Sequence, residues 1–224
     1  MTVDEQVKKH IVEQLYWDDR VNAADVRVEC SEGRVVLSGT VANYAAKRAA
    51  ENDALKTPGV AAIENRLEIF YPAETDLPSD QEISSRIASR LLWDSDIDAA
   101  NIDVFVEGGI AVLEGTVDSY WKKVKAELFA FEIYGVTSVE NKLAVVPTRD
   151  ILDEAVAESI TAALSRNSTV DANAIDVGVE EGRVVLAGSV EDWNAFLIAQ
   201  DIAAYTLGVV DVTTNLVVRQ PERV

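Results

Sequence analysis

A six-residue segment that occurs twice without change constrains the fold of this chain more than any other feature. Residues 32–37 read Glu-Gly-Arg-Val-Val-Leu and recur unchanged as residues 181–186, and residues 108–113 form a looser middle copy. The copies begin 76 and 73 residues apart. An internal repeat of this period indicates that the chain consists of three copies of one structural unit.

Each copy opens with the apolar pattern of an amphipathic helix. Apolar residues recur at i, i+4 and i+8, the spacing of one helix face, namely Val7, Ile11 and Leu15, then Ile83, Ile87 and Leu91, then Val156, Ile160 and Leu164. Thr2 with Glu5, and Ser79 with Glu82, have the spacing of a capping box, in which a hydroxyl and a carboxylate each accept a hydrogen bond from a backbone N–H. We therefore predict that every copy begins with a helix.

Two strands joined by a tight turn are predicted next. Apolar residues alternate over residues 26–30, 102–106 and 175–179, which is the period of a half-buried strand. A glycine then supplies the positive φ that a tight hairpin turn needs, and it stands at Gly33, Gly109 and Gly182. A second glycine is expected to close the second strand, at Gly39, Gly115 and Gly188.

A second helix and a third strand complete each copy. The helix keeps alanines four residues apart, as at Ala50 and Ala54, and these small side chains let it approach a sheet closely. A glycine-valine pair such as Gly59-Val60 ends the helix before the last strand. The sequence predicts an α+β fold of three tandem α-β-β-α-β modules, each with two helices packed on a three-stranded mixed sheet. Their ranges are 1–71 for module 1, 79–147 for module 2 and 151–219 for module 3.

The charge of the chain narrows its possible partners. Asp and Glu outnumber Lys and Arg by 39 to 20, which gives a net charge of −19 and repels a phosphate backbone. We therefore expect no nucleic-acid partner. Cys30 is the only cysteine, so the fold does not depend on an intrachain disulfide. The chain as given shows no signal peptide and is expected to be cytoplasmic, or periplasmic if a signal has been cleaved from it.

Side chains that perform catalysis or bind metals are scarce. His10 is the only histidine, so neither a Cys/His pair of catalytic type nor a histidine-rich metal site can form within one chain. Residues 94–98 begin like a calcium loop, but Ala99 and Phe105 stand where that loop needs glycine and glutamate. We expect no catalytic residue, no metal and no cofactor. The alternative is an enzyme with a carboxylate-based site, which would need raised carboxylate pKa values in a cleft.

Two tryptophans are candidates for an interaction surface. Trp17 and Trp93 occupy the same position, just after the first helix of modules 1 and 2, and module 3 has Arg166 there. We expect both rings to pack against the helix end in the core. The alternative is an exposed ring that contacts a partner, because tryptophan is enriched in binding hot spots.

The second helix differs most between the modules. In module 1 it carries Asn52 and Asp53, whereas in modules 2 and 3 it is apolar nearly all round, as is typical of a helix buried on more than one side. We predict that these two helices contact each other or form a self-association surface. The candidate interface residues are Phe129, Phe131, Phe196, Ile202 and Tyr205.

The repeated motif is V-x-V, then G-x-V-x-L-x-G-x-V, a helix, and G-V-x-x-V-x-N-x-L. In module 1 it is carried by Gly33, Leu37, Gly39, Val41, Gly59, Val60, Asn65 and Leu67. In module 3 Thr214 replaces the asparagine. This motif resembles the BON domain, named for bacterial osmotically induced periplasmic and nodulation proteins. The resemblance implies two helices on a three-stranded sheet, no catalytic residues, and contact with phospholipid or envelope proteins during osmotic or other stress.

These features predict a non-enzymatic binding or assembly protein, acting as a bacterial stress- or envelope-related adaptor. Its partner would be another protein or a second copy of the chain. The alternative is a membrane-associated phospholipid-binding protein, periplasmic if exported. The charge of −19 weighs against that alternative, because anionic bilayers attract basic surfaces.

Overall fold

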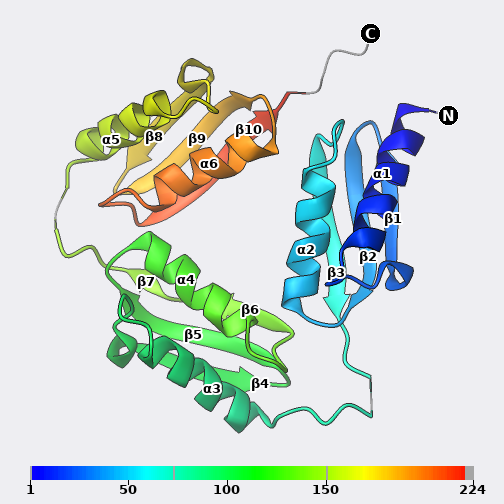
Figure 1. The fold of residues 1–224 in the computed structure, drawn as a ribbon. Helices are drawn as coiled ribbons and strands as arrows, with labels where there is room; N and C mark the ends of the chain where they lie inside the picture. The colour runs from blue at the N-terminus through cyan, green and yellow to red at the C-terminus, as the bar shows by residue number, and fades with distance from the viewer. Residues whose placement is uncertain (1, 73, 150, 220–224) are drawn as a thin grey trace. The chain divides into compact units, whose positions relative to one another are not determined.

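The computed structural model describes residues 2–72, 74–149 and 151–219 (Figure 1). Met1 and Ala73, which fall in the predicted first module and the linker after it, lie outside these ranges. Module 1 consists of α1 (Val3–Trp17), β1 (Val26–Ser31), β2 (Arg34–Val41), α2 (Tyr44–Leu55) and β3 (Ala62–Ile69). Module 2 consists of α3 (Asp80–Leu92), β4 (Ile102–Glu107), β5 (Ile110–Val117), α4 (Tyr120–Phe131), β6 (Ser138–Asn141) and β7 (Ala144–Val145). Module 3 consists of α5 (Asp153–Arg166), β8 (Ile175–Glu180), β9 (Arg183–Val190), α6 (Trp193–Ala204) and β10 (Asp211–Val218).

Every module has its own mixed sheet. In module 1 the order is β1-β2-β3, with β1 antiparallel and β3 parallel to β2. Modules 2 and 3 repeat this order, except that the last strand of module 2 is interrupted and pairs with β5 as β6 and β7. In each module both helices cover the same face of the sheet (Figure 1). The predicted α+β fold of three tandem modules is therefore confirmed.

The predicted helix stripe forms the core between helices and sheet. In module 1, Val7, Ile11 and Leu15 are at most 4% exposed, and they pack against Val35 and Leu37 of β2. Burial of each such side chain contributes about 1.5 to 3 kcal/mol. The predicted capping boxes are also present, at Thr2 with Glu5 and at Ser79 with Glu82. The local pattern and the tertiary packing thus agree at the start of the first two modules.

A carboxylate ties the first helix to the hairpin turn in all three modules. Asp4 accepts hydrogen bonds from the backbone N–H groups of Glu32 and Gly33, at 2.9 and 3.2 Å. Asp80 and Asp153 make the equivalent pairs of bonds in modules 2 and 3. Both central turn residues have positive φ, 52° at Glu32 and 76° at Gly33, as a type I′ hairpin requires. The glycine in the turn was predicted, and the carboxylate that holds the turn was not.

The second repeated glycine does not close its strand. Gly39 lies within β2, which continues to Val41, so this detail of the sequence interpretation is wrong. The structure gives a different reason for the glycine. Its φ is +112°, and a Cβ on it would overlap the backbone carbonyl oxygen of Asp25, just before β1. The close approach of two backbone segments therefore requires glycine here.

The modules group into two compact units. Module 1 lies in the unit that contains residues 1–77, and modules 2 and 3, as far as Val217, lie in the unit Pro78–Val217.

Candidate functional site

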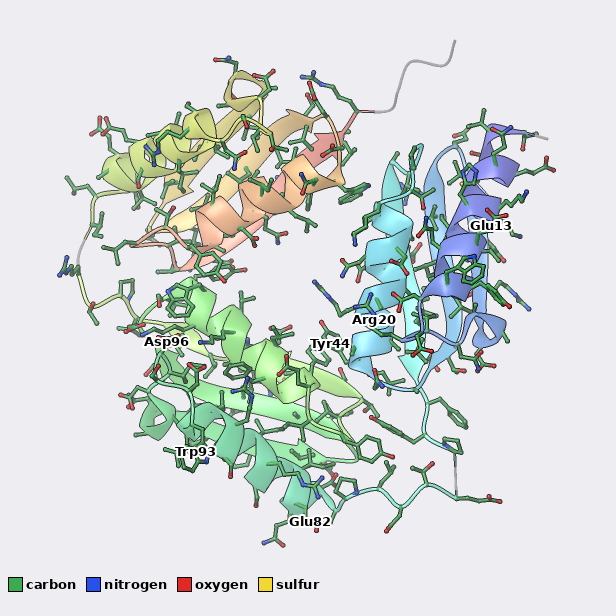
Figure 2. The ribbon with its side chains drawn as sticks, viewed as in Figure 1. Glu13, Arg20, Tyr44, Glu82, Trp93 and Asp96 are labelled. Carbon is green, nitrogen blue, oxygen red and sulfur yellow. The ribbon has the colours of Figure 1, made fainter. Side chains whose placement is uncertain are left out.

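Two exposed aromatic ends are the clearest candidate binding surfaces. We use this name for Tyr16 with Trp17 at the end of α1, and for Leu92 with Trp93 at the end of α3. Trp17 is 82% exposed and Trp93 is 86% exposed, and Tyr16 meets the Trp17 ring edge-on at 5.4 Å between ring centroids. Figure 2 labels Trp93 and, three residues further along the chain, Asp96.

The expectation that the two tryptophans pack in the core is wrong. Successive helix residues are about 100° apart around the axis, so Trp17 lies about 200° from the buried Leu15. Trp93 stands in the same relation to the buried Leu91. Each ring therefore projects from the side of the helix opposite to the core. Helix geometry could have revealed this from the sequence.

Charged clusters next to each aromatic end differ between the modules. In module 2, Lys125 of α4 lies 2.8 Å from Asp94 and 2.7 Å from Asp96. The hydrogen bond from Lys125 lowers the pKa of Asp94. Asp98 instead accepts a hydrogen bond from the N–H of Ala100 at the start of a short 3-10 turn. The run 94–98 therefore ends the helix and pairs with a lysine. Among the described residues no group of three or more acidic, histidine or cysteine side chains could hold a metal ion.

In module 1 the corresponding cluster contains two carboxyl groups. The Arg20 guanidinium donates to Asp18 with Nε–Oδ1 at 2.9 Å, and these bonds hold the pKa of Asp18 well below its usual range. Asp53 of α2 lies beside this pair, and its Oδ2 is buried without a hydrogen-bond partner among the described residues. Burial raises the pKa of Asp53, and the negative charge of Asp18 raises it further. An ionised Asp53 is therefore a local source of instability in module 1.

We expect Asp53→Asn to stabilise module 1 at neutral pH. A carboxyl group whose pKa is raised on folding binds its proton more tightly in the folded state, so the stability of wild type increases as pH falls through that raised pKa. Asparagine is neutral at every pH, and its advantage over wild type should therefore shrink on acidification. Urea unfolding, followed by the NMR signal of the Trp17 indole N–H at about pH 8 and about pH 4.5, measures both effects.

The matched control is Asp19→Asn, which removes an exposed carboxylate next to Asp18 and should leave both measurements unchanged. An advantage of Asp53→Asn that is equal at both pH values would contradict the assignment of the effect to ionisation of Asp53.

The candidate residues on α4 have different surroundings. Phe129 is 5% exposed and lies in the core of module 2 itself. The guanidinium of Arg90, from α3, lies over its ring at 3.6 Å from the centroid. Phe131 is half-buried and packs against the same core. These surroundings account for the burial of Phe129 without a second module.

The candidate residues on α6 are less buried. Phe196 is half-buried and lies 4.8 Å from the Trp193 ring on the same helix, and Ile202 is half-buried. Tyr205 is 67% exposed and stacks on Trp121 of α4, with ring centroids 5.9 Å apart and an interplanar angle of 19°. Sequence reasoning missed Trp121, although it follows Tyr120 at the start of α4. The interface between the second helices stays a prediction.

The histidine and the cysteine have surroundings that fit no reactive role. His10 is exposed on α1. Cys30 is half-buried against the core of module 1, and burial raises the pKa of its thiol. A raised thiol pKa disfavours the reactive thiolate. In the described part of the chain, no helix combines the length and the apolar character needed to cross a membrane.

The repeated asparagine has a structural role. Asn65 of β3 donates to the carbonyl oxygen of Lys47 at 3.4 Å and to the carboxylate of Glu51 at 3.3 Å, and it accepts from the N–H of Leu67. Asn141 makes the same three bonds in module 2. The motif asparagine therefore fastens the last strand to the second helix, and Thr214 stands at this position in module 3.

The comparison with protein families agrees with this architecture. Residues 3–69, 79–147 and 152–220 each match the BON domain. Because these matches together cover most of the chain, the protein belongs to the BON domain family.

The individual proteins that resemble this chain have low sequence identity to it. Osmotically-inducible protein Y of Escherichia coli strain K12 is 27% identical over 188 residues, which cover 81% of this chain and 92% of that protein. Among solved structures, CdsD, a structural protein of the type III secretion system of Chlamydia trachomatis, aligns over 97% of this chain and 93% of its own. That alignment has 16% identity and a TM-score of 0.28.

Proposed function

We propose that this chain is a non-catalytic adaptor that binds a protein partner through its two exposed aromatic ends. The observation that carries the proposal is the exposure of Trp17 and Trp93, 82% and 86%, at the same position of two modules. Burying a large apolar side chain contributes about 1.5 to 3 kcal/mol, and the folded chain forgoes this at both positions. A partner that covers the rings would recover it, and tryptophan is enriched in such contacts.

The repetition of the aromatic end supports an adaptor in particular. Two equivalent surfaces on one chain can engage a repeated or dimeric partner, and linked weak contacts then gain affinity through effective concentration. The scarcity of histidine and cysteine supports a non-catalytic role. The family and the osmotically-inducible relative support a bacterial function in osmotic or envelope stress.

Phospholipid contact is the second candidate function, with a periplasmic location if the protein is exported. Exposed tryptophan favours it as well, because an indole ring is suited to the boundary between apolar chains and water. The carboxylates of Asp18 and Asp94 directly follow the two rings and would oppose an anionic surface. A zwitterionic bilayer fits this arrangement better than an anionic one.

The double variant Trp17→Ser with Trp93→Ser tests both functions. We expect it to keep the wild-type melting temperature, because the removed rings are exposed, and to lose at least about tenfold in binding, or about 1.4 kcal/mol. Tagged full-length protein is used in a pull-down from bacterial lysate after osmotic upshift, beside co-sedimentation with phosphatidylcholine vesicles. Loss in the pull-down supports the adaptor, and loss in the vesicle assay alone supports lipid contact.

Phe105→Ser is the matched control, since Phe105 is also an exposed aromatic residue, at 56%, but belongs to β4 and to neither aromatic end. The proposal is contradicted if the double variant retains every partner that wild type and the control retain. Turnover in a broad hydrolase and transferase screen, abolished by one carboxylate substitution, would contradict the non-catalytic role.

A further inference from the structure

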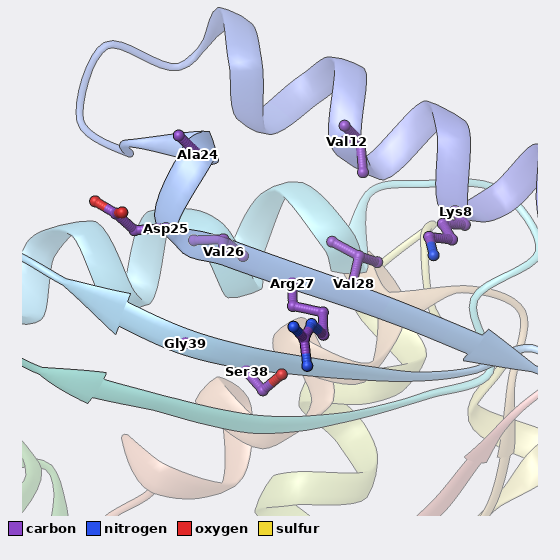
Figure 3. A pocket seen from close by; sticks show the side chains of 9 residues that line it. All are labelled: Lys8, Val12, Ala24, Asp25, Val26, Arg27, Val28, Ser38 and Gly39. Atoms are coloured by element: carbon purple, nitrogen blue, oxygen red, sulfur yellow. The ribbon is translucent and has the colours of Figure 1, made fainter.

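A groove of about 540 Å³ runs along the outer edge of β1 in module 1 (Figure 3). Lys8 and Val12 of α1 border it on the helix side of the sheet, and Arg27 and Ser38 border it on the opposite face. Its floor is the segment 24–28, which leads into and forms the first half of β1. The groove therefore follows one strand lengthwise and is open to both faces of the sheet.

The edge of β1 offers backbone hydrogen-bonding groups. Among the described strands, the sheet order β1-β2-β3 leaves one side of β1 without a neighbour. In module 2 the hydroxyl of Ser84 donates to the carbonyl oxygen of Val104 at 3.0 Å, so the carbonyl at this position of the edge strand points outward. Lys8 and Val28 hold the corresponding positions in module 1. No described side chain hydrogen-bonds the carbonyl of Val28. Because Val28 is only 2% exposed, an added strand must displace the side chains that cover this part of the edge.

Two cations flank this edge. Neither Lys8 nor Arg27 lies within 4.0 Å of a described carboxylate, and both are exposed. Asp25, the acid that lines the groove, already accepts a hydrogen bond from Asn22 at 2.6 Å. The charged side chains that line the groove are thus two cations that pair with no described acid and one acid that already accepts a hydrogen bond.

The other two modules do not repeat the pair. Lys8 corresponds to Ser84 in module 2 and Ala157 in module 3, and Arg27 corresponds to Asp103 and Asp176. The fold alone therefore does not require either cation. Both positions are cationic in module 1, whereas in modules 2 and 3 one is neutral and the other is acidic.

We propose that the β1 edge of module 1 binds an extended, acidic peptide segment of a partner protein as an added strand. The peptide backbone would pair with the outward N–H and C=O groups of β1, which is a general mode of peptide recognition. Side chains of an added strand alternate between the two faces. An acidic side chain would thus meet Arg27 on the open face or Lys8 on the helix side, and an apolar neighbour would cover Val12, which is 42% exposed.

This site goes beyond the proposed function and stands on separate residues. The aromatic ends could fail as partner surfaces while the β1 edge still binds peptide, and the reverse also holds. The experiment below therefore uses variants that leave Trp17 and Trp93 intact.

A phage-displayed library of random octapeptides, selected on the full-length protein, tests the proposal. Selected peptides should contain Asp or Glu and lack internal proline, because proline has no N–H to donate. They should bind wild type at least about tenfold more tightly than the double variant Lys8→Glu with Arg27→Glu. Amide hydrogen exchange in β1 should slow when such a peptide is bound.

Lys47→Glu with Arg48→Glu is the matched control, since it changes the net charge equally but on α2, and it should keep the peptide affinity of wild type. Transfer of the pair to module 2 by Ser84→Lys with Asp103→Arg should create a second peptide site with the same acidic preference.

Three results would overturn the proposal. The first is a selection that enriches no peptide, and the second is peptides that bind the Lys8 and Arg27 variant as well as wild type. The third is binding that depends on Lys8 and Arg27 but is seen only with vesicles containing phosphatidylglycerol, which would assign the cations to a lipid headgroup.

Discussion

Replacing Gly39 with alanine is expected to unfold module 1. The new Cβ would overlap the carbonyl oxygen of Asp25, and the φ of +112° is one that residues with a side chain rarely adopt. The contact is between two backbone segments, so no side-chain rotation can relieve it. We expect a loss of about 4 kcal/mol or more, at the exceptional end for one substitution. A domain of about 70 residues has a small free energy of unfolding, so a loss of this size would unfold it.

Two glycines of the same chain are matched controls for Gly39. Gly108 has a φ of +59°, and no described atom outside its immediate neighbours lies within 4 Å of the place that a Cβ would take. Gly108→Ala should therefore cost only the strain of a left-handed residue, about 1 to 2 kcal/mol. Gly178 lies in β8 with an ordinary φ, and Gly178→Ala should be neutral or stabilising by up to about 1 kcal/mol.

Amide hydrogen exchange resolved by module measures these differences, because the chain need not unfold in one step. The loss should be confined to the module that carries the substitution. If Gly39→Ala costs no more than Gly108→Ala, the backbone contact with Asp25 does not exist in solution as described.

The second large effect is expected for Phe129→Ala. Phe129 is 5% exposed in the core of module 2, and removal of a buried phenylalanine ring costs about 3 to 5 kcal/mol. The substitution also removes the ring beneath the guanidinium of Arg90. Exchange protection in α3, α4 and β5 should fall together, since all three contribute residues to the core cluster that contains Phe129.

Leu128→Ala is the control for Phe129, because Leu128 is the preceding residue on α4 and is 45% exposed. It should cost less than about 1 kcal/mol. A small stability loss for Phe129→Ala, no larger than that for Leu128→Ala, would instead favour Phe129 as an interface residue, as the sequence pattern predicts. In that case Phe129→Ala would leave module 2 itself stable and would change the scattering mass or the protection of α6 instead.

The sequence by itself determined the modular architecture. Val7, Ile11 and Leu15 mark the buried face of α1 because a helix repeats every 3.6 residues, and Gly33 marks the hairpin because its φ must be positive. Both rules depend only on residues that are close in sequence. The same pattern occurs in all three copies, and this repetition supports the prediction of three modules. The exposure of Trp17 was available from the same helix geometry and was missed because an aromatic ring was assumed to need a core.

Only the tertiary structure decided what depends on segments that are distant along the chain. Gly39 must be glycine because the carbonyl of Asp25 approaches it, and Asp4 holds a turn 28 residues away. An apolar residue such as Phe129 can be buried by its own module or by a neighbouring one. Its hydrophobicity is the same in both cases, so the sequence does not distinguish them. Lys8 of α1 and Arg27 of β1 likewise come from two different elements, and only the folded chain brings them to the two sides of the β1 edge. Sequence periodicity specifies which face of an element is apolar, and the folded chain alone specifies what lies opposite that face.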